Sequence, residues 1–466
     1  MTQEAGGDRR RTSSSSSRRR LRKLRIPRQR TVSAPASAAF SRERFEQWAQ
    51  QRTPNVSLSE IIYLEAVTVP EVMYCFWDAV LQRQSDAHPE AILAFPHFRN
   101  GSTLSARIAG HVHECADVCT VLGQQAYATF FGGSGAEDSA PCFCVHLRMR
   151  DDVADNIGSV DGGADAAVEE EEEDEDEWLS PHLAALLEQA RRDDEAELQS
   201  KQGTSTDSAF DHSQSVSPSV PRDTDQILHD TKRWVESVVA GAHICPFMLS
   251  AECGGLPSAP VHYEVSGARS PEHAYRDFWA HVALLQYSDP KRISTTLLVT
   301  PHLLQDGSAD DSLCSAEAFD AVTAPLQSAL TELGLEQLVQ LVFFHPGYVF
   351  RDGNDRYAVD AQVGARPTDY ARRSPWPMIN VLRTRQVRMG QRGIPTESVY
   401  RRNAEFLAHV GVRKLQRMLE ERDWSGMSGD AQADAQDAAS QPDDVQQAVE
   451  RVRRTVGESC RAGDRP

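Results

Sequence analysis

An internal repeat of short segments constrains the fold of this chain more than any other feature of its sequence. Four segments of the first half recur in the second half in the same order. The pairs, each marked by its first residue, are PEVMYCFWDAV (Pro70) with PEHAYRDFWAHV (Pro271), ILAFPHF (Ile92) with LLVTPHL (Leu297), LGQQAYATFFGG (Leu122) with LGLEQLVQLVFFHPG (Leu333), and APCFCVHLR (Ala140) with SPWPMINVLR (Ser374). We interpret these pairs as a tandem duplication, which predicts two related folding units.

Hydrophobic periodicity predicts the same alternation of strands and helices in each half. The first half reads as strand, helix, strand, helix and strand over Ile61–Leu64, Pro70–Leu81, Ala91–Phe95, a stretch ending at Leu122, and Ala126–Phe131. The second half repeats this order over Val261–Val265, a helix opened by Ser270 and Pro271, Thr295–Thr300, Ala316–Leu333 and Leu338–Phe344. The sequence therefore predicts an α+β protein made of two β-α-β-α-β units.

The arrangement of the strands is left with two alternatives. An antiparallel, ferredoxin-like sheet with helices on one face is favoured, because helices and strands alternate at short spacing. A doubly wound parallel α/β sheet is the alternative.

Charge divides the 466 residues into five segments. Residues 1–44 form a basic tail rich in Arg and Ser, which is typical of a disordered segment or a mitochondrial transit peptide. Residues 45–149 form the first unit and residues 231–422 the main unit. Between them, residues 150–230 form an acidic linker containing nine consecutive acids and one short amphipathic helix, and residues 423–466 form a mostly disordered tail.

Composition narrows the compartment and the partners. No run approaches 18 apolar residues, so no membrane span is expected. Nine cysteines without a secretory signal indicate reduced thiols and an intracellular protein, with the mitochondrion, cytoplasm and nucleus as alternatives. The basic tail or the acidic linker could contact a protein complex, and the tail's arginines also suit nucleic acid. No cofactor is indicated.

Residues 231–420 resemble a family catalogued as domain of unknown function 1415. The resemblance is carried by Cys245-Pro246-Phe247, Thr295 to Val299, Phe344-His345-Pro346 with Tyr348 and Phe350, Arg373-Ser374-Pro375 with Pro377, Leu382-Arg383, Arg402-Asn403 and Gly411. Residues 45–149 look like a degenerate second copy. The resemblance implies a site but no known activity.

The candidate site combines a cysteine, a histidine and arginines near strand ends. Cys245 and His345 are the candidate catalytic pair, because a nearby imidazole can convert a thiol into a nucleophilic thiolate. The expected ligand is a small anion, which arginines bind through forked hydrogen bonds. The candidate ligand-binding residues are Phe247, Tyr348, Arg373, Ser374, Asn380 and Arg383.

Two departures from the family pattern weaken a catalytic interpretation. Gly347 stands where relatives carry an acidic residue after His-Pro, and Asn380 stands where they carry a histidine. If either residue transfers a proton in relatives, this chain has lost that group.

The main expectation is that the chain binds no metal. The alternative is a metal site in the first half. Its candidate ligands are His111, His113, Cys115, Cys119, Cys142, Cys144 and His146. Zinc favours such donors, and spacing of four residues places two of them on one helix face. The usual spacing of two residues between paired cysteines is absent.

Two classes of function remain open. The first is an enzyme or enzyme-derived domain that binds a small anionic ligand at the Cys/His/Arg pocket. The second is a non-enzymatic assembly or interaction protein of a larger complex.

Overall fold

The computed structural model describes ten stretches of the chain between Phe40 and Met427. These are residues 40–54, 56–83, 90–123, 125–133, 140–149, 223–256, 258–305, 313–350, 366–394 and 396–427. Most of the predicted linker, most of the basic tail and nearly all of the C-terminal tail lie outside these residues. The end of the linker, residues 223–230, is described and enters helix α5 (Thr224–Trp234). Within the described residues, no helix is both long enough and apolar enough to cross a membrane.

The N-terminal half contains one four-stranded sheet. Its elements are α1 (Arg42–Arg52), the 3-10 turn η1 (Leu58–Glu60), β1 (Ile61–Tyr63), α2 (Val69–Arg83), β2 (Glu90–Phe95), α3 (Gly101–Ala116), β3 (Ala126–Phe131) and β4 (Phe143–Met149). The strands lie in the order β1-β2-β4-β3, and only the β1–β2 pair is parallel.

The C-terminal half contains a five-stranded sheet and more helices. Its elements are α5 (Thr224–Trp234), the π-helical turn η2 (Val235–Gly241), β5 (Cys253–Gly254), β6 (Ala259–Val265), α6 (Pro271–Tyr287), β7 (Thr295–Val299), α7 (Ala316–Glu332), β8 (Val339–Phe344), η4 (Pro367–Ala371), β9 (Met378–Arg383), α8 (Thr384–Gly393), α9 (Thr396–Val410) and α10 (Val412–Glu421). The strand order is β5-β6-β7-β9-β8, and β6–β7 is the parallel pair.

The α+β class is confirmed, and both proposed strand arrangements are wrong. Each half runs β-α-β-α-β-β, whereas a ferredoxin-like unit runs β-α-β-β-α-β. A doubly wound sheet is excluded because the last two strands of each half pair antiparallel. The final strands β4 and β9 insert between earlier strands, and the sequence analysis assigned neither of them.

The two sheets share their order, direction and register. Leaving out β5, the order β6-β7-β9-β8 matches β1-β2-β4-β3 strand for strand. Ile92 of β2 lies opposite His146, and its sequence-matched counterpart Leu297 lies opposite Asn380. The positions of His146 and Asn380 in the two sheets are therefore equivalent.

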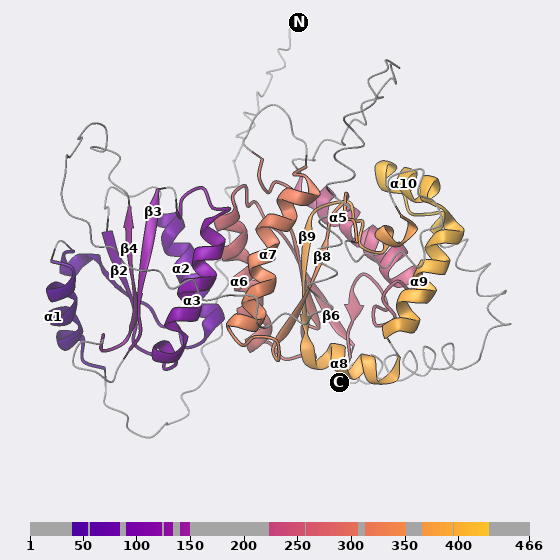
Figure 1. Ribbon diagram of the computed structural model, residues 1–466. Helices are drawn as coiled ribbons and strands as arrows, with labels where there is room; N and C mark the ends of the chain where they lie inside the picture. The colour runs from indigo at the N-terminus through magenta and orange to yellow at the C-terminus, as the bar shows by residue number, and fades with distance from the viewer. Residues whose placement is uncertain are drawn as a thin grey trace, which may run out of the picture. The chain divides into compact units, whose positions relative to one another are not determined.

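Helices α2, α3, α6 and α7 lie between the two sheets, as Figure 1 shows. Their apolar faces and the inner faces of both sheets form one continuous core cluster. Trp77 of α2 contacts the Tyr275 ring of α6 at a centroid distance of 5.1 Å. Burial on this scale is the main stabilising contribution to folding, at about 25 cal/mol for each Å² of apolar surface.

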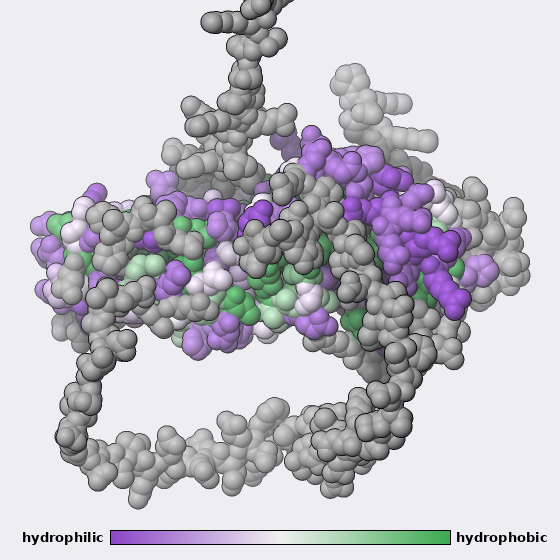
Figure 2. Space-filling model, turned by 90° about the horizontal axis from the view of Figure 1, so that it is seen from above, coloured by the Kyte–Doolittle hydropathy of each residue, from purple (hydrophilic) through white to green (hydrophobic). Residues whose placement is uncertain are grey.

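The outer faces of the sheets are covered unequally. Helix α1 covers the N-terminal sheet through Phe45 and Ala49. On the C-terminal sheet, α5, η2, α9 and α10 bury a larger cluster that includes Trp234 and Trp376. Hydrophilic residues gather over the end of the molecule where α5, α9 and α10 lie (Figure 2), so these helices present one apolar and one solvated face.

Candidate metal centre

Cys245 lies in a loop that follows the π-helical turn. Asn403 of α9 donates to the Ile244 carbonyl at 2.8 Å, and Arg402 donates to the Ala242 and His243 carbonyls, so α9 fixes the loop. The thiol packs against the outer apolar cluster. Burial raises the pKa of Cys245, although the amides of Phe247 and Met248 oppose this by hydrogen bonding to the sulfur. The neutral thiol is therefore the stable form.

His345 is held as a neutral imidazole. The Gly347 amide donates to Nδ1 at 3.0 Å, so Nε2 carries the proton and donates to the Cys314 carbonyl at 3.0 Å. The ring stacks on Phe319 of α7 with centroids 5.4 Å apart. Burial lowers the pKa of His345 to about 4. The role that these contacts support is stabilisation of the turn at Gly347.

The predicted Cys245–His345 pair is not formed. Cys245 packs in the cluster on the outer face of the sheet, whereas His345 stacks on Phe319, whose helix covers the inner face. Among the described residues, the hydrogen bonds of the His345 ring go to Cys314 and Gly347, and none goes to Cys245. Sequence reasoning failed here because a strand end indicates an edge of the sheet but not the face toward which a side chain turns.

The two predicted anion-binding arginines lie at opposite ends of β9. Arg373 precedes β9, donates to the Tyr348 carbonyl at 3.0 Å and lies over the Tyr370 ring at 4.8 Å. Arg383 ends β9 and donates to the carbonyls of Leu285 at 2.6 Å, Ser288 at 3.0 Å and Ile293 at 3.1 Å. Arg383 therefore caps the C-terminal end of α6, where a cation is favourable.

The other predicted ligand-binding residues also have structural partners. The Ser374 hydroxyl donates to the Trp376 carbonyl at 2.7 Å, and Asn380 accepts a 2.7 Å hydrogen bond from Thr295. Phe247 packs closely against Gly390 of α8, where a Cβ atom would lie 2.6 Å from the ring. Within the described residues, the predicted set forms two separate contact groups, Cys245 with Phe247 and His345 with Tyr348 and Arg373.

The seven candidate metal ligands of the N-terminal half do not assemble. Cys115 and Cys119 face the inner core, whereas Cys142 and Cys144 face the outer one. His146 lies 3.1 Å from Glu90, and His113 is exposed. His111 lies near Cys115 Sγ, at 3.7 Å from Nε2, but its other neighbours are carboxylates that the sequence analysis did not include.

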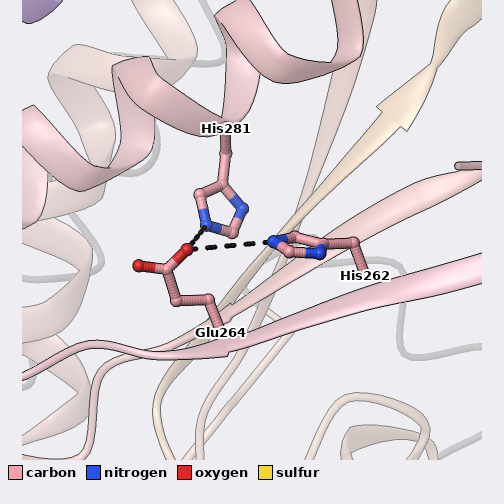
Figure 3. A group of neighbouring side chains, drawn as sticks. All are labelled: His262, Glu264 and His281. Atoms are coloured by element: carbon pink, nitrogen blue, oxygen red, sulfur yellow. Dashed lines mark hydrogen bonds and ion pairs between the residues drawn. The ribbon is translucent and has the colours of Figure 1, made fainter. Parts of the chain in front are cut away.

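A different group of metal-binding side chains converges in the C-terminal half. His262 and Glu264 alternate along β6, so both point to the same face of the sheet. His281 projects from α6 toward them, as Figure 3 shows. Ligand atoms of the three residues all lie within 4.8 Å of one another.

The distances within this group suit a shared ion. His281 Nε2 lies 3.0 Å and His262 Nε2 lies 3.8 Å from the same atom, Glu264 Oε2. The second distance is too long for a hydrogen bond. With bonds of about 2.0–2.1 Å, the ligands of a tetrahedral zinc ion lie about 3.3 Å apart, between the two observed distances.

Buried polar atoms around the group lack partners. His262 Nε2 and His281 Nδ1 have no hydrogen-bond partner among the described residues, and neither has the hydroxyl of Thr296. Thr296 lies opposite His262 in the parallel β6–β7 pair. A buried polar atom without a partner costs about 1–3 kcal/mol, so the unpaired His262 Nε2, which faces Glu264, indicates a ligand at this place.

Electrostatics keep the carboxylate of this group ionised. The neighbouring imidazoles of His262 and His281 hold the pKa of Glu264 well below its usual range, and the shorter of the two contacts is the 3.0 Å hydrogen bond with His281. The side chain of His281 is 1% exposed, whereas those of His262 and Glu264 are 32% and 36% exposed. The group is thus closed on the α6 side and open toward solvent on the β6 side.

The first half lacks this group at the equivalent positions. Strand register aligns His262 with Glu60 and Glu264 with Ile62, since Tyr263 lies opposite Leu297 as Ile61 lies opposite Ile92. The repeated helix segment aligns His281 with Val80. Only the C-terminal half therefore carries the three ligands.

The fold and the group together define the C-terminal half as an α+β domain with a candidate metal centre. Residues 226–417, from α5 to α10, match the family model described as "Protein of unknown function (DUF1415)". This match confirms the resemblance carried by Cys245-Pro246-Phe247 and the later motifs. The chain has no match among curated proteins and none among solved structures.

Proposed function

We propose that the C-terminal half is a metal-binding domain that holds one zinc ion through His262, Glu264 and His281. The main support is that three ligand atoms lie within 4.8 Å of one another. Two of them come from alternate residues of β6, which share one face of the sheet, and one comes from α6. Two histidines and one glutamate form a ligand set that zinc uses in catalytic sites. The protein remains an enzyme or enzyme-derived domain in this proposal. Its centre is the His262, Glu264 and His281 group instead of the Cys/His/Arg pocket.

The unequal burial of the ligands supports an open rather than a closed metal site. Structural zinc sites usually use four protein ligands, whereas catalytic sites use three and keep one position for water or substrate. Here three ligands are present, and the exposed sides of His262 and Glu264 leave access from solvent. A zinc ion in this position would lower the pKa of its bound water and so supply a nucleophile for hydrolysis.

Each residue has a separate role in this proposal. Glu264 supplies the negative charge, and its low pKa means that no proton must leave before the metal binds. His281 fixes the buried side of the site because α6 packs tightly around it. His262, whose Nε2 has no hydrogen-bond partner among the described residues, supplies a free lone pair.

Metal content of the purified full-length chain tests this function. Glu264→Gln and His262→Gln alter partly exposed side chains, so both variants should fold and give wild-type circular dichroism. Each should bind one zinc equivalent fewer than the wild type, measured by elemental analysis after dialysis. His97→Gln, at an exposed histidine outside the group, is the matched control. Unchanged zinc content in both variants would refute the site, and stoichiometric iron instead of zinc would refute the choice of metal.

We also infer that the two halves arose by duplication and that the first half supports assembly. Equal strand order, equal register at His146 and Asn380, and the repeated sequence segments support this inference. The absence of the ligand group from the described first half favours an interaction role over a second active site. This role agrees with the assembly class of the sequence analysis, with α2 against α6 as the surface that joins the halves.

A further inference from the structure

A second group of ligand atoms lies where the two halves meet. His111 and Glu114 belong to α3 of the N-terminal half, and Glu332 ends α7 of the C-terminal half. One ligand atom from each lies within 4.8 Å of the other two. Helices α3 and α7 contact each other, and Figure 1 shows both of them between the two sheets. The group shares no residue with the His262, Glu264 and His281 centre.

Acidic side chains gather at this contact. Glu114 and Glu332 both stand near the C-terminal ends of their helices, where the backbone carbonyls already carry partial negative charge. Asp117 follows α3 and adds another acid. Arg107 donates to the backbone carbonyl of Glu332 at 3.5 Å, which leaves the two carboxylates facing each other. Like charges this close repel each other, the more so when partly buried.

His111 offers a lone pair to the same place. Its side chain is fully buried, and Cys115 Sγ lies near both ring nitrogens, at 3.9 Å from Nδ1 and 3.7 Å from Nε2. One thiol can serve only one of the two nitrogens at a time. Because sulfur is a weak hydrogen-bond partner, this contact leaves the buried imidazole suited to a stronger ligand.

We propose that His111, Glu114 and Glu332 bind a divalent cation of the zinc class that joins the two halves. Such an ion would neutralise both carboxylates and complete the contacts of the buried imidazole. Because the ligands come from helices of different halves, binding would stabilise the packing of α3 on α7. The role is structural, in contrast to the solvent-facing centre on β6.

Zinc titration of the full chain in two backgrounds separates the two sites. In Glu264→Gln, which lacks the β6 centre, one zinc equivalent should remain, and zinc should raise the melting temperature. Adding Glu332→Gln should weaken binding at this remaining site by at least about tenfold and abolish the rise in melting temperature. Glu332→Gln alone, in the otherwise wild-type chain, should remove one zinc equivalent and leave the one bound by His262, Glu264 and His281.

Asp117→Asn is the matched control, because it removes a neighbouring negative charge without removing a ligand. It should keep the zinc equivalent and the zinc-dependent rise in melting temperature. If Asp117→Asn and Glu332→Gln have equal effects, general electrostatics explain the result and the cation site is wrong. It is also wrong if zinc leaves the melting temperature of the Glu264→Gln variant unchanged. A failure of the β6 centre would appear separately, as unchanged zinc content in Glu264→Gln.

Discussion

At the scale of single residues, burial sets the protonation of His345 and makes stability depend on pH. The unfolded imidazole has a pKa of about 6.5, whereas burial lowers the pKa in the folded chain to about 4. Between these values the unfolded state binds the additional proton, so the free energy of unfolding rises with pH. Across this pH range, the titration of His345 changes the free energy of unfolding by at most about 3 kcal/mol.

The variant His345→Gln should lose this part of the pH dependence. Glutamine does not titrate, so the slope of the free energy of unfolding between pH 4 and 6.5 should become shallower than in the wild type. Urea unfolding at a series of pH values measures the slope. The exposed His97→Gln serves as control and should keep the wild-type slope. An equal slope in His345→Gln and wild type would show that His345 titrates normally in the folded chain.

At the scale of elements, the packing of α8 on Phe247 depends on a helical glycine. A Cβ atom at Gly390 would lie 2.6–2.7 Å from carbons of the Phe247 ring, whereas a Cβ atom at Gly110 of α3 would meet nothing within 4 Å. Both glycines stand inside helices, where alanine is intrinsically better by about 0.8–1.0 kcal/mol. Steric contact alone therefore distinguishes the two positions.

Opposite changes in stability are expected from the two glycine substitutions. Gly390→Ala should destabilise the chain by about 1–3 kcal/mol, because Phe247 and its loop must move. Gly110→Ala should stabilise it by about 0.5–1 kcal/mol. Denaturant midpoints of both variants measure the difference. If the two substitutions shift the midpoint in the same direction, α8 does not pack on Phe247 as described.

The elements that could be predicted are those with a local signal. The strand at Thr295 and the helix opened by Ser270 were predicted because β-branched runs, capping residues and apolar periodicity are properties of neighbouring residues. Insertion of β9 between β7 and β8 was not predictable, because long-range pairing decides it. No strand was assigned to the segment before Arg383, and it is the central strand β9.

The metal centre was missed for a related reason. Along β6, Tyr263 and Val265 alternate with His262 and Glu264, which suggests an apolar face on the core and a polar face in solvent. Both faces are covered, because the outer cluster packs on Tyr263 and Val265 while α6 covers the opposite face. The available signal was His281, three residues after Phe278 on the apolar side of its helix. A buried histidine at this position needs a polar partner, which the sheet covered by α6 can provide.

At the scale of the whole molecule, the two halves share one core and one buried carboxylate contact. Glu272, at the start of α6, is fully buried and accepts hydrogen bonds from the Val121 amide at 2.7 Å and the Thr120 hydroxyl at 3.2 Å. The matching residue Glu71 binds the Thr68 amide of its own half instead. The carboxylate of α6 therefore holds the N-terminal half, and that of α2 caps its own helix.

Unfolding of the two halves should consequently be a single transition that Glu272→Ala shifts as a whole. Removal of the carboxylate leaves the Val121 amide buried without an acceptor, which should cost about 1–3 kcal/mol. Hydrogen exchange of β2 and β7, followed against denaturant in the presence of EDTA so that no metal contributes, reports each half separately. Both strands should lose protection together, at a lower midpoint in the variant. Thr120→Val removes only the longer contacts of the hydroxyl, at 3.2 and 3.4 Å, and should produce a smaller shift. Loss of protection in β2 alone, with β7 unchanged, would mean that the halves fold independently and that the shared core contributes little to either.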